Sequence, residues 1–210
     1  MDESSVSQPG SVSPKVACAL ALARQHPAEL VHLEQVARLS VVLFDGLKPL
    51  HRLVLGERDL LCCAALLHDI GISVGYKGHH KSSRKLIEGA DLPALTTCER
   101  SIVAQLARYH RKAAPSEKHR AYRELDPDSQ RRVLRLAPIL RIADGLDRAH
   151  QNAVARVEIV LPDPGGACRI DLFGPGDLDY AAWGARRKAG LFAEVYGVDV
   201  SFEPKGPVID

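Results

Sequence analysis

The spacing of apolar residues divides the chain into two parts. From residue 15 to about residue 153, apolar side chains recur every three or four positions, the period of one face of an α-helix. From residue 154 the segments VARVEIVL and CRIDLF alternate apolar and polar residues, as strands do. We therefore predict a mainly α fold: a helical bundle over residues 15–153, with a small C-terminal α+β appendage over residues 154–210 packed on it.

Start and stop signals mark several of the predicted helices. Thr96 and Glu99 have the spacing of a capping box, and Asp126 precedes Pro127 as a candidate N-cap. Gly71 is expected to supply the backbone freedom that ends one helix. The pattern predicts helices over Lys15–Gln25, Glu29–Leu47, Glu57–His68, Ser82–Gly89, about Thr97–His110 and about Pro127–Ala149.

The C-terminal part is predicted to contain a β-hairpin and one further helix. The DPGG stretch between the two strand-like segments is a turn signal. One helix is expected over Asp179–Val195, and VDVSF is a candidate final strand. At the other end, MDESSVSQPGSVSP (residues 1–14) is rich in Ser, Pro and Gly, and we expect a disordered leader there.

Composition excludes several functional classes. A length of 210 residues fits one domain with a sizeable core, and a net charge of +2 does not indicate a nucleic-acid or membrane-surface protein. No apolar stretch is long enough to span a bilayer and no signal sequence is visible, so we expect a cytoplasmic protein. The five cysteines contain no CxxC pair, so neither a disulfide framework nor a thiolate zinc site is expected.

Helical phase directs four metal-binding side chains toward the predicted core. A single buried histidine is ordinarily a hydrogen-bonded core residue, but a buried carboxylate needs a partner or a cation. When several such groups share one interior, a metal site is the simplest explanation. The four share a helix face with apolar residues: His32 with Val36, Leu39 and Leu43; His68 with Ala64 and Leu61; His110 with Leu106 and Val103; and Asp144 with Leu140, Ala137 and Val133.

These groups predict a centre for one or two divalent transition-metal ions. One ion would be held by His32, His68, Asp69 and Asp144; the second would be held by His110 and either His79 or His80, with Asp69 shared. Nitrogen and carboxylate ligands suit Mn, Fe, Zn, Co or Ni. Asp69 and His110 are also the candidate catalytic residues.

The order His … His-Asp … Asp on successive helices resembles the HD superfamily of metal-dependent phosphohydrolases. LLHDIGISVGYKGHHKSSRKLI, LARYHRKAAP and LRLAPILRIADGLDRAHQ more closely resemble the C-terminal HD-like domain of the exopolyphosphatase/guanosine pentaphosphate phosphatase (Ppx/GppA) family. The resemblance covers about residues 15–203 and implies an HD-type bundle and a possible homodimer. That family usually carries this region behind two actin-like ATPase-fold domains, so we expect the accessory domain standing alone. It commonly has a further histidine where this chain has Ser82, which leaves the number of ions open.

The predicted function is metal-dependent hydrolysis of a phosphomonoester or phosphoanhydride, with a nucleotide or short polyphosphate as the phosphorylated small molecule. Fixed cations would bind the phosphate. The candidates are Lys81, Arg84, Arg111, Lys112 and Arg148, of which Lys81 and Arg111 adjoin predicted ligands most closely.

Other polar residues receive structural interpretations. Asp147 is expected to orient Arg148, to act behind a ligand or to form an ion pair. His26, His51, His119 and His150 are read as surface residues, and Arg186–Lys188 as the solvated face of a helix, with anion binding or a dimer contact as the alternative.

Two alternatives to an enzyme stay open at this point. The first is a non-catalytic module that binds an anionic phosphate ligand or a separately encoded phosphatase partner. The second is an inert bundle with a structural metal. Ligand-dependent stabilisation without turnover would favour the first alternative.

Overall fold

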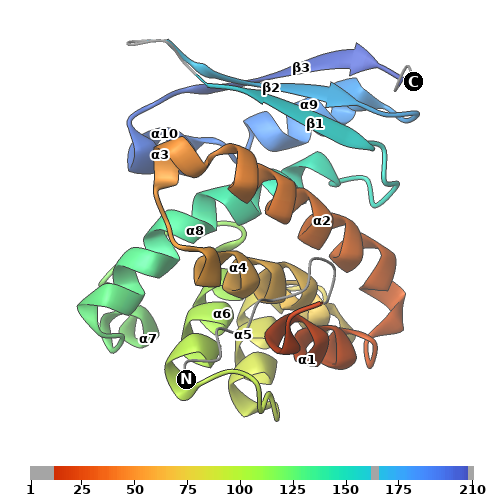
Figure 1. Cartoon of the computed structure of the whole chain (residues 1–210). Coiled ribbons are helices and arrows are strands. Elements are labelled where there is room, and N and C mark those ends of the chain that lie inside the picture. The colour runs from red at the N-terminus through yellow and green to blue at the C-terminus, as the bar shows by residue number, and fades with distance from the viewer. Residues whose placement is uncertain (1–11, 162–165, 208–210) are drawn as a thin grey trace, which may run out of the picture.

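The structure, a computed structural model, describes residues 12–161 and 166–207. It is mainly helical, with a three-stranded sheet lying on one side of the helices (Figure 1). The helices of the first part are α1 (Pro14–Ala23), α2 (Leu30–Gly46), α3 (Lys48–His51), α4 (Leu55–Leu67), α5 (His79–Gly89), α6 (Thr97–Tyr109), α7 (Arg120–Arg123) and α8 (Pro127–Leu146), with 3-10 turns at Pro27–Glu29 and Ile70–Ser73.

Helix α4 is the centre of the bundle. It contacts α1, α2, α6 and α8, and its residues from Leu60 onward are buried almost without interruption. A helix that is apolar on nearly all sides is stable only inside a core. Its C-terminal end therefore carries His68 and Asp69 into the interior of the protein, where α2, α6 and α8 also converge (Figure 1).

The caps expected from the sequence are present. Thr96 and Glu99 form a capping box at the start of α6, and the Asp126 side chain accepts hydrogen bonds from the backbone N–H groups of Asp128 and Ser129 at the start of α8. Ser13 caps α1, and Pro14, the last residue of the expected leader, begins this helix. The rest of that leader, residues 1–11, lies outside the described residues.

Three helices in the first part differ most from the prediction. Helix α3 is a single turn that directly follows the expected helix end at Leu47. Helix α5 begins at His79 rather than Ser82, because Gly78 adopts a φ of 82°, a left-handed conformation in which glycine is not strained. Helix α7 lies at the end of a stretch expected to be a loop. It is a single turn, too short to produce a readable helical period.

The C-terminal part contains β1 (Arg156–Val160), β2 (Cys168–Phe173), α9 (Leu178–Arg186), α10 (Gly190–Tyr196) and β3 (Val200–Gly206). Strands β1 and β2 pair antiparallel as expected, and β3 joins β2 in parallel, so the sheet has the order β1-β2-β3. The expected DPGG turn falls largely on residues 162–165, outside the described residues. Because β3 runs parallel to β2, α9 and α10 form the crossover connection between them.

The single helix expected over Asp179–Val195 is wrong. The chain forms α9 and α10, joined by a tight turn in which the N–H of Lys188 donates to the carbonyl of Ala185. Helix α9 lies between the sheet and α8 (Figure 1), and α10 also packs on α8. Gly190, a weak helix former, begins α10 at this break.

One apolar cluster joins both parts of the chain. It includes Leu61 of α4, Leu140 of α8, Ile170 of β2 and Phe202 of β3, all fully buried. All five cysteines are free thiols. In the part of the chain that the structure describes, no helix is long and apolar enough to cross a membrane.

Candidate metal and phosphate site

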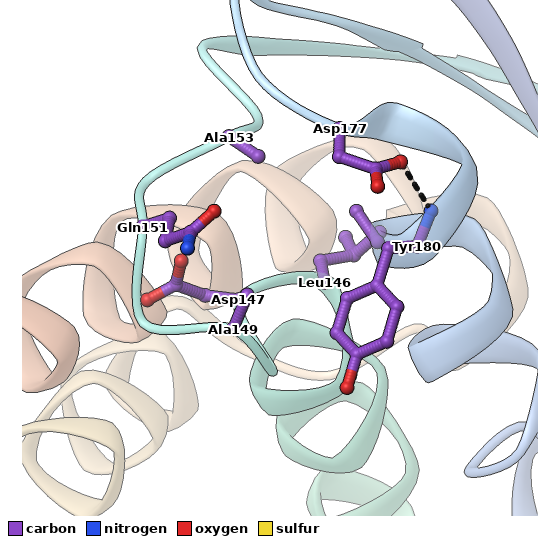
Figure 2. A pocket seen from close by; sticks show the side chains of 8 residues that line it. Leu146, Asp147, Ala149, Gln151, Ala153, Asp177 and Tyr180 are labelled. Carbon is purple, nitrogen blue, oxygen red and sulfur yellow. Dashed lines mark hydrogen bonds between the residues drawn. The ribbon is translucent and has the colours of Figure 1, made fainter.

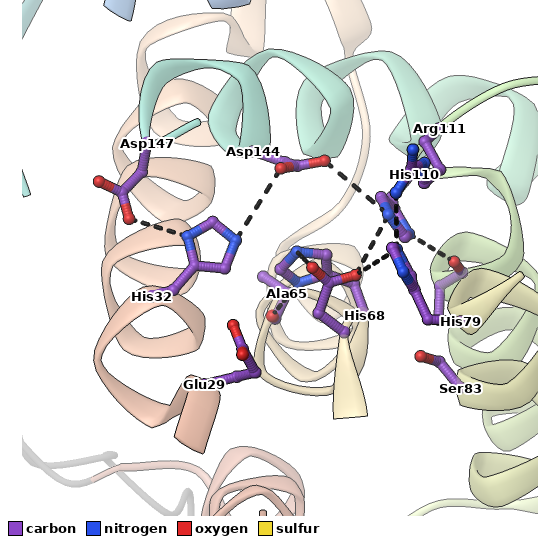
Figure 3. Close-up of polar contacts among 12 residues, drawn as sticks. Glu29, His32, Ala65, His68, His79, Ser83, His110, Arg111, Asp144 and Asp147 are labelled. Atoms are coloured by element: carbon purple, nitrogen blue, oxygen red, sulfur yellow. Dashed lines mark hydrogen bonds and ion pairs between the residues drawn. The ribbon is translucent and has the colours of Figure 1, made fainter. Parts of the chain in front are cut away.

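The predicted ligand residues come from five helices or helix ends and meet beside one pocket. Figure 3 shows His32, His68, His79, His110 and Asp144 directed toward one another. His32 lies in the first turn of α2, His68 is the C-cap of α4 and Asp69 follows it. His79 begins α5, His110 is the C-cap of α6, and Asp144 lies in the last turn of α8. All six side chains are buried.

Two groups of three residues have the geometry of a metal site. His32, His68 and Asp144 each offer one ligand atom, and the three atoms lie within 4.8 Å of one another. His68, Asp69 and His110 form a second such group by the same measure. Nε2 of His110 lies 3.3 Å from Oδ1 of Asp69 and 4.0 Å from Oδ2 of Asp144, which connects the two groups.

Each histidine ring is oriented by a hydrogen bond from its other nitrogen. The Nδ1–H groups of His68, His79 and His110 donate to the carbonyls of Ala65 (2.7 Å), Tyr76 (2.9 Å) and Ala107 (2.7 Å), each three residues earlier in the chain. Nδ1 of His32 lies 2.8 Å from the Asp147 carboxylate. A carbonyl only accepts, so these rings carry the proton on Nδ1 and present the Nε2 lone pair to the interior, as metal-bound histidines do.

Several of the inward atoms have no partner of their own. Nε2 of His32, Nε2 of His68 and Oδ1 of Asp69 are buried and accept no hydrogen bond from the described residues. Leaving a buried polar atom unpaired is costly. The set fits a divalent cation, which would satisfy the lone pairs and the carboxylates at once.

The electrostatics keep the groups in the forms that bind metals. Burial lowers the pKa of His68, and it lowers the pKa of His110 to about 3, so both rings are neutral at physiological pH. Burial alone would raise the pKa of Asp69 and of Asp144. At Asp144 the ammonium group of Lys188 acts in the opposite direction, and the pKa of this carboxyl lies below its ordinary value. The pKa of Asp69 also lies below its ordinary value, and both groups are ionised.

A basic pocket opens above these residues. Its volume is about 450 Å³, and Asp69, His79, His110 and Asp144 contribute to its lining. The cations around them come from three parts of the chain: Arg111 and Lys112 after α6, Arg141 and Arg148 of α8 and its end, and Arg187 and Lys188 between α9 and α10. Such a surface suits an anionic ligand with more than one charge.

Lys81 and Arg84, two of the five predicted phosphate contacts, do not line this pocket. Both line a different groove, together with Lys85, Arg108 and Lys118. Helix α5 begins with His79 directed at Asp69, and successive residues turn by about 100°. Positions two and five further along therefore point away from the pocket. Arg111, Lys112 and Arg148, the other three predicted phosphate contacts, do line it.

The choice between His79 and His80 also follows from the start of α5. Nε2 of His79 lies 3.1 Å from Oδ1 of Asp69. His80 is buried but does not line the pocket, and its ring centroid is 6.4 Å from that of His110. Burial, with Arg108 next in importance, lowers the pKa of His80 to about 4. His79 is thus the residue that joins Asp69 and His110.

Three residues beside the site were not assigned to it from the sequence. Lys188 donates to Oδ2 of Asp144 and Arg187 lines the same pocket, although the sequence favoured a solvated face for both, with anion binding or a dimer contact as the alternative. His150 is exposed, as expected of a surface residue, but it also lines the pocket, and its ring stacks on His32 with centroids 3.7 Å apart. One signal was available: Gly145 and Gly184 interrupt helical patterns, and such glycines often mark a close approach of two backbones.

Other polar residues have structural contacts. Asp147 holds His32 rather than Arg148, and its second oxygen accepts from the N–H of Asn152. His51, expected at the surface, is buried and bonded to the carbonyl of Phe44. His119 contacts the hydroxyl of Tyr109.

A smaller cavity of about 280 Å³ adjoins the basic pocket between the end of α8 and the start of α9 (Figure 2). Asp147 and Tyr180 lie on its lining, and Tyr180 also lines the basic pocket. The Asp177 side chain accepts from the N–H of Tyr180 and caps α9. The wall between the two cavities is therefore held by a helix cap.

Comparison with known proteins shows which family the sequence matches. The family described as Ppx/GppA phosphatase, domain III, matches residues 15–172. The chain belongs to this family. The matched residues of this chain include all the predicted ligands, from His32 to Asp144. Arg187 and Lys188 lie beyond the part that matches the Ppx/GppA family.

One relative with a known name is also similar. The guanosine-5'-triphosphate,3'-diphosphate pyrophosphatase of Aeromonas hydrophila subsp. hydrophila is 32% identical over an alignment of 126 residues, and the alignment covers 58% of this chain. The matched region covers 24% of that Ppx/GppA relative, so the chain spans about a quarter of its length.

Proposed function

We propose that this chain is a metal-dependent phosphohydrolase with an HD-type centre in its helical bundle. The proposal is carried by one observation: the buried Nε2 atoms of His32 and His68, which have no partner among the described residues, converge with the Asp144 carboxylate beside a pocket lined by arginines and lysines. Residues that can bind a metal ion thus lie next to residues that can bind a phosphate.

His32, His68, Asp69 and Asp144 would hold the principal ion. A bound divalent ion supplies two kinds of chemistry there, lowering the pKa of a water and polarising a phosphoryl oxygen. Asp147 fixes the ring of His32, and the carbonyl of Ala65 fixes that of His68, so the ligand geometry is set before the ion arrives.

The chain's own residues would bind and orient the substrate. Arg111 and Arg148 present planar guanidinium groups that can donate two hydrogen bonds to one phosphate, and Lys112 adds a point charge. Asp69, ionised and on the pocket lining, is placed to accept a proton from the attacking water. His110, within 3.3 Å of Asp69, would orient that carboxylate.

A phosphoanhydride of a nucleotide or a short polyphosphate is the substrate class that we propose. The six basic side chains around the pocket carry more positive charge than a single phosphate would neutralise, and this favours a ligand with several phosphate groups. The Aeromonas relative is named as a pyrophosphatase of a nucleotide that carries a triphosphate and a diphosphate. Tyr76 and Tyr180, both exposed in part, also line the pocket and offer faces for a base.

A non-catalytic role is the second candidate, and the coverage of the relative favours it. Because the chain corresponds to 24% of that protein, the named activity can depend on regions that lie outside the match. In that case the same pocket would bind a phosphorylated ligand, or the chain would dock on a phosphatase partner, without turnover.

The first experiment is elemental analysis of protein purified without a histidine tag and reconstituted with Mn²⁺ or Zn²⁺, beside a His68→Ala/Asp69→Ala double variant. We expect near-stoichiometric metal in the wild type and its loss in the variant. A panel of nucleotides, short polyphosphates and phosphomonoesters then tests hydrolysis. Thermal stabilisation by a panel member without release of phosphate would favour the binding module. A wild-type protein that takes up no metal would refute the hydrolase.

A further inference from the structure

The two groups of candidate ligands differ in what they already contact. In the group of His32, His68 and Asp144, the Nε2 atoms of both histidines have no partner among the described residues. Around the second predicted position, beside Asp69, His79 and His110, two cations of the chain contact candidate ligand atoms: Arg111 contacts Nε2 of His79, and Lys188 donates to Oδ2 of Asp144, the oxygen nearer His110. No such cation contacts the two Nε2 atoms of the first group in the part of the chain that the structure describes.

Arg111 donates a hydrogen bond to the lone pair on Nε2 of His79. Its Nη1 lies 3.0 Å from Nε2 of His79. The Nδ1–H of that ring is directed to the carbonyl of Tyr76 at 2.9 Å, so Nε2 is the only atom through which His79 can accept. A guanidinium group can only donate. His79 therefore already binds a cation through the atom that a second metal would need.

Lys188 occupies the outer oxygen of Asp144. Its ammonium group donates to Oδ2, the oxygen that lies 4.0 Å from Nε2 of His110. The other oxygen, Oδ1, lies 3.9 Å from Nε2 of His32. Only 14% of the Lys188 side chain is exposed, so its charge is held in the pocket wall rather than in solvent.

The position of Lys188 is fixed by the crossing of α8 and α9. A Cβ atom at Gly184 would lie 2.3 Å from the carbonyl oxygen of Gly145, and one at Gly145 would lie 2.7 Å from Cα of Ala185. The two backbones are thus in direct contact at the residue after Asp144. Lys188 follows Gly184 by about one helical turn, so the crossing delivers its ammonium group to Asp144.

We propose that the centre binds one metal ion, and that Arg111 and Lys188 supply the positive charge of a second. This inference rests on the metal site of the proposed function. Two fixed cations on the ligand atoms of the second position would repel a divalent ion there. They would still neutralise phosphate charge, as a second metal does in two-metal sites, and neither can dissociate from the protein.

The test is the number of ions bound, measured independently of hydrolysis. Wild-type protein is titrated with Mn²⁺ and with Zn²⁺ by calorimetry, and the count is checked by elemental analysis after desalting. We expect about one ion per chain in the wild type. In an Arg111→Met/Lys188→Met double variant, which keeps side-chain length but removes both charges, we expect a second ion bound at least ~10-fold more tightly than any second ion in the wild type.

A matched control removes two charges elsewhere. Lys85 and Lys118 line the separate groove beside α5 and α6, and a Lys85→Met/Lys118→Met variant should bind one ion, as the wild type does. Tight binding of two ions by the wild type would overturn the inference, as would an unchanged count in a folded Arg111→Met/Lys188→Met variant. If that variant does not fold, by circular dichroism, the single Lys188→Met variant and the wild-type count decide.

The result can be separated from the test of the proposed function. One bound ion without hydrolysis of any phosphoester leaves the inference standing and refutes only the enzymatic activity. Two tightly bound ions together with hydrolysis would refute the inference of a single ion and support the enzymatic activity.

Discussion

The His32 ring is held from behind by Asp147, with Nδ1 of the histidine 2.8 Å from Oδ2 of the aspartate. Asp147 is itself only 2% exposed and lies three residues after Asp144, which faces the opposite nitrogen of the same ring (Figure 3). One helix end thus supplies both a candidate ligand and the group that orients a second one. Because Asp144 and Asp147 are only three residues apart, the local backbone, rather than a long-range contact, fixes the position of one carboxylate relative to the other.

Replacing Asp147 should therefore weaken metal binding without removing a ligand. For Asp147→Ala we expect a loss of about 10- to 100-fold in affinity for Mn²⁺ or Zn²⁺, the usual effect of removing a group that orients a histidine ligand. Calorimetric titration measures it. Asp91→Ala, at an exposed position, is the control. Equal affinity of the two variants would show that Asp147 has no such role.

Adding a methyl group at the crossing of α8 and α9 should destabilise the protein. In Gly184→Ala the new Cβ atom would lie 2.3 Å from the Gly145 carbonyl oxygen and 3.1 Å from Cβ of Arg148. Backbone atoms cannot rotate away, so we expect a loss of about 1–3 kcal/mol in the free energy of unfolding. Urea denaturation measures it, with Gly190→Ala, where a Cβ meets nothing within 4 Å, as the control. If both variants unfold at the same urea concentration, the inference that the backbones of α8 and α9 are in close contact at Gly184 is wrong.

Gly71 is predicted to be required for a close approach rather than for an unusual backbone angle. It lies in a 3-10 turn and is not among the residues with positive φ, in contrast to the expectation from the sequence. A Cβ there would lie 2.3 Å from the carbonyl oxygen of His79 and 2.4 Å from the N atom of Ser83.

Gly71→Ala should consequently move the start of α5 away from Asp69. We expect a loss of about 1–3 kcal/mol in stability by chemical denaturation. Gly89→Ala, with open space around its Cβ position, provides the comparison. A Gly71→Ala protein as stable as Gly89→Ala would contradict the packing of the 3-10 turn on α5.

The cations of the pocket and those of the separate groove should differ in their effect on hydrolysis. Arg148 lines the basic pocket, so Arg148→Ala should lower kcat/KM by about 10- to 100-fold, the cost of losing a charged hydrogen bond to the transition state. Lys81→Ala and Arg84→Ala should leave it within about twofold, because both residues line the other groove. Steady-state kinetics on the best substrate of the panel provides the measurement. If Arg84→Ala impaired the enzyme as much as Arg148→Ala, the proposal that the phosphate binds in the basic pocket would be wrong.

The sequence alone determined the features that depend on local periodicity. His32, His68, His110 and Asp144 were found because a helix returns to the same face every three to four residues, so apolar neighbours reveal which way a polar side chain points. The caps at Thr96 and Asp126 were found for a similar reason, since a cap is built from residues two or three positions apart. The antiparallel pairing of β1 with β2 followed from their alternation and from a short connection.

The tertiary structure decided everything that depends on how two elements meet. His79 rather than His80 faces Asp69 because Gly78 sets the first residue of α5, and a shift of one residue turns a helix face by about 100°. The same rotation takes Lys81 and Arg84 out of the pocket. Lys188 reaches Asp144 across 44 residues of sequence, through a helix crossing that two glycines permit. Periodicity describes one helix at a time, so a cation brought in by a neighbouring helix leaves no mark on the pattern around Asp144.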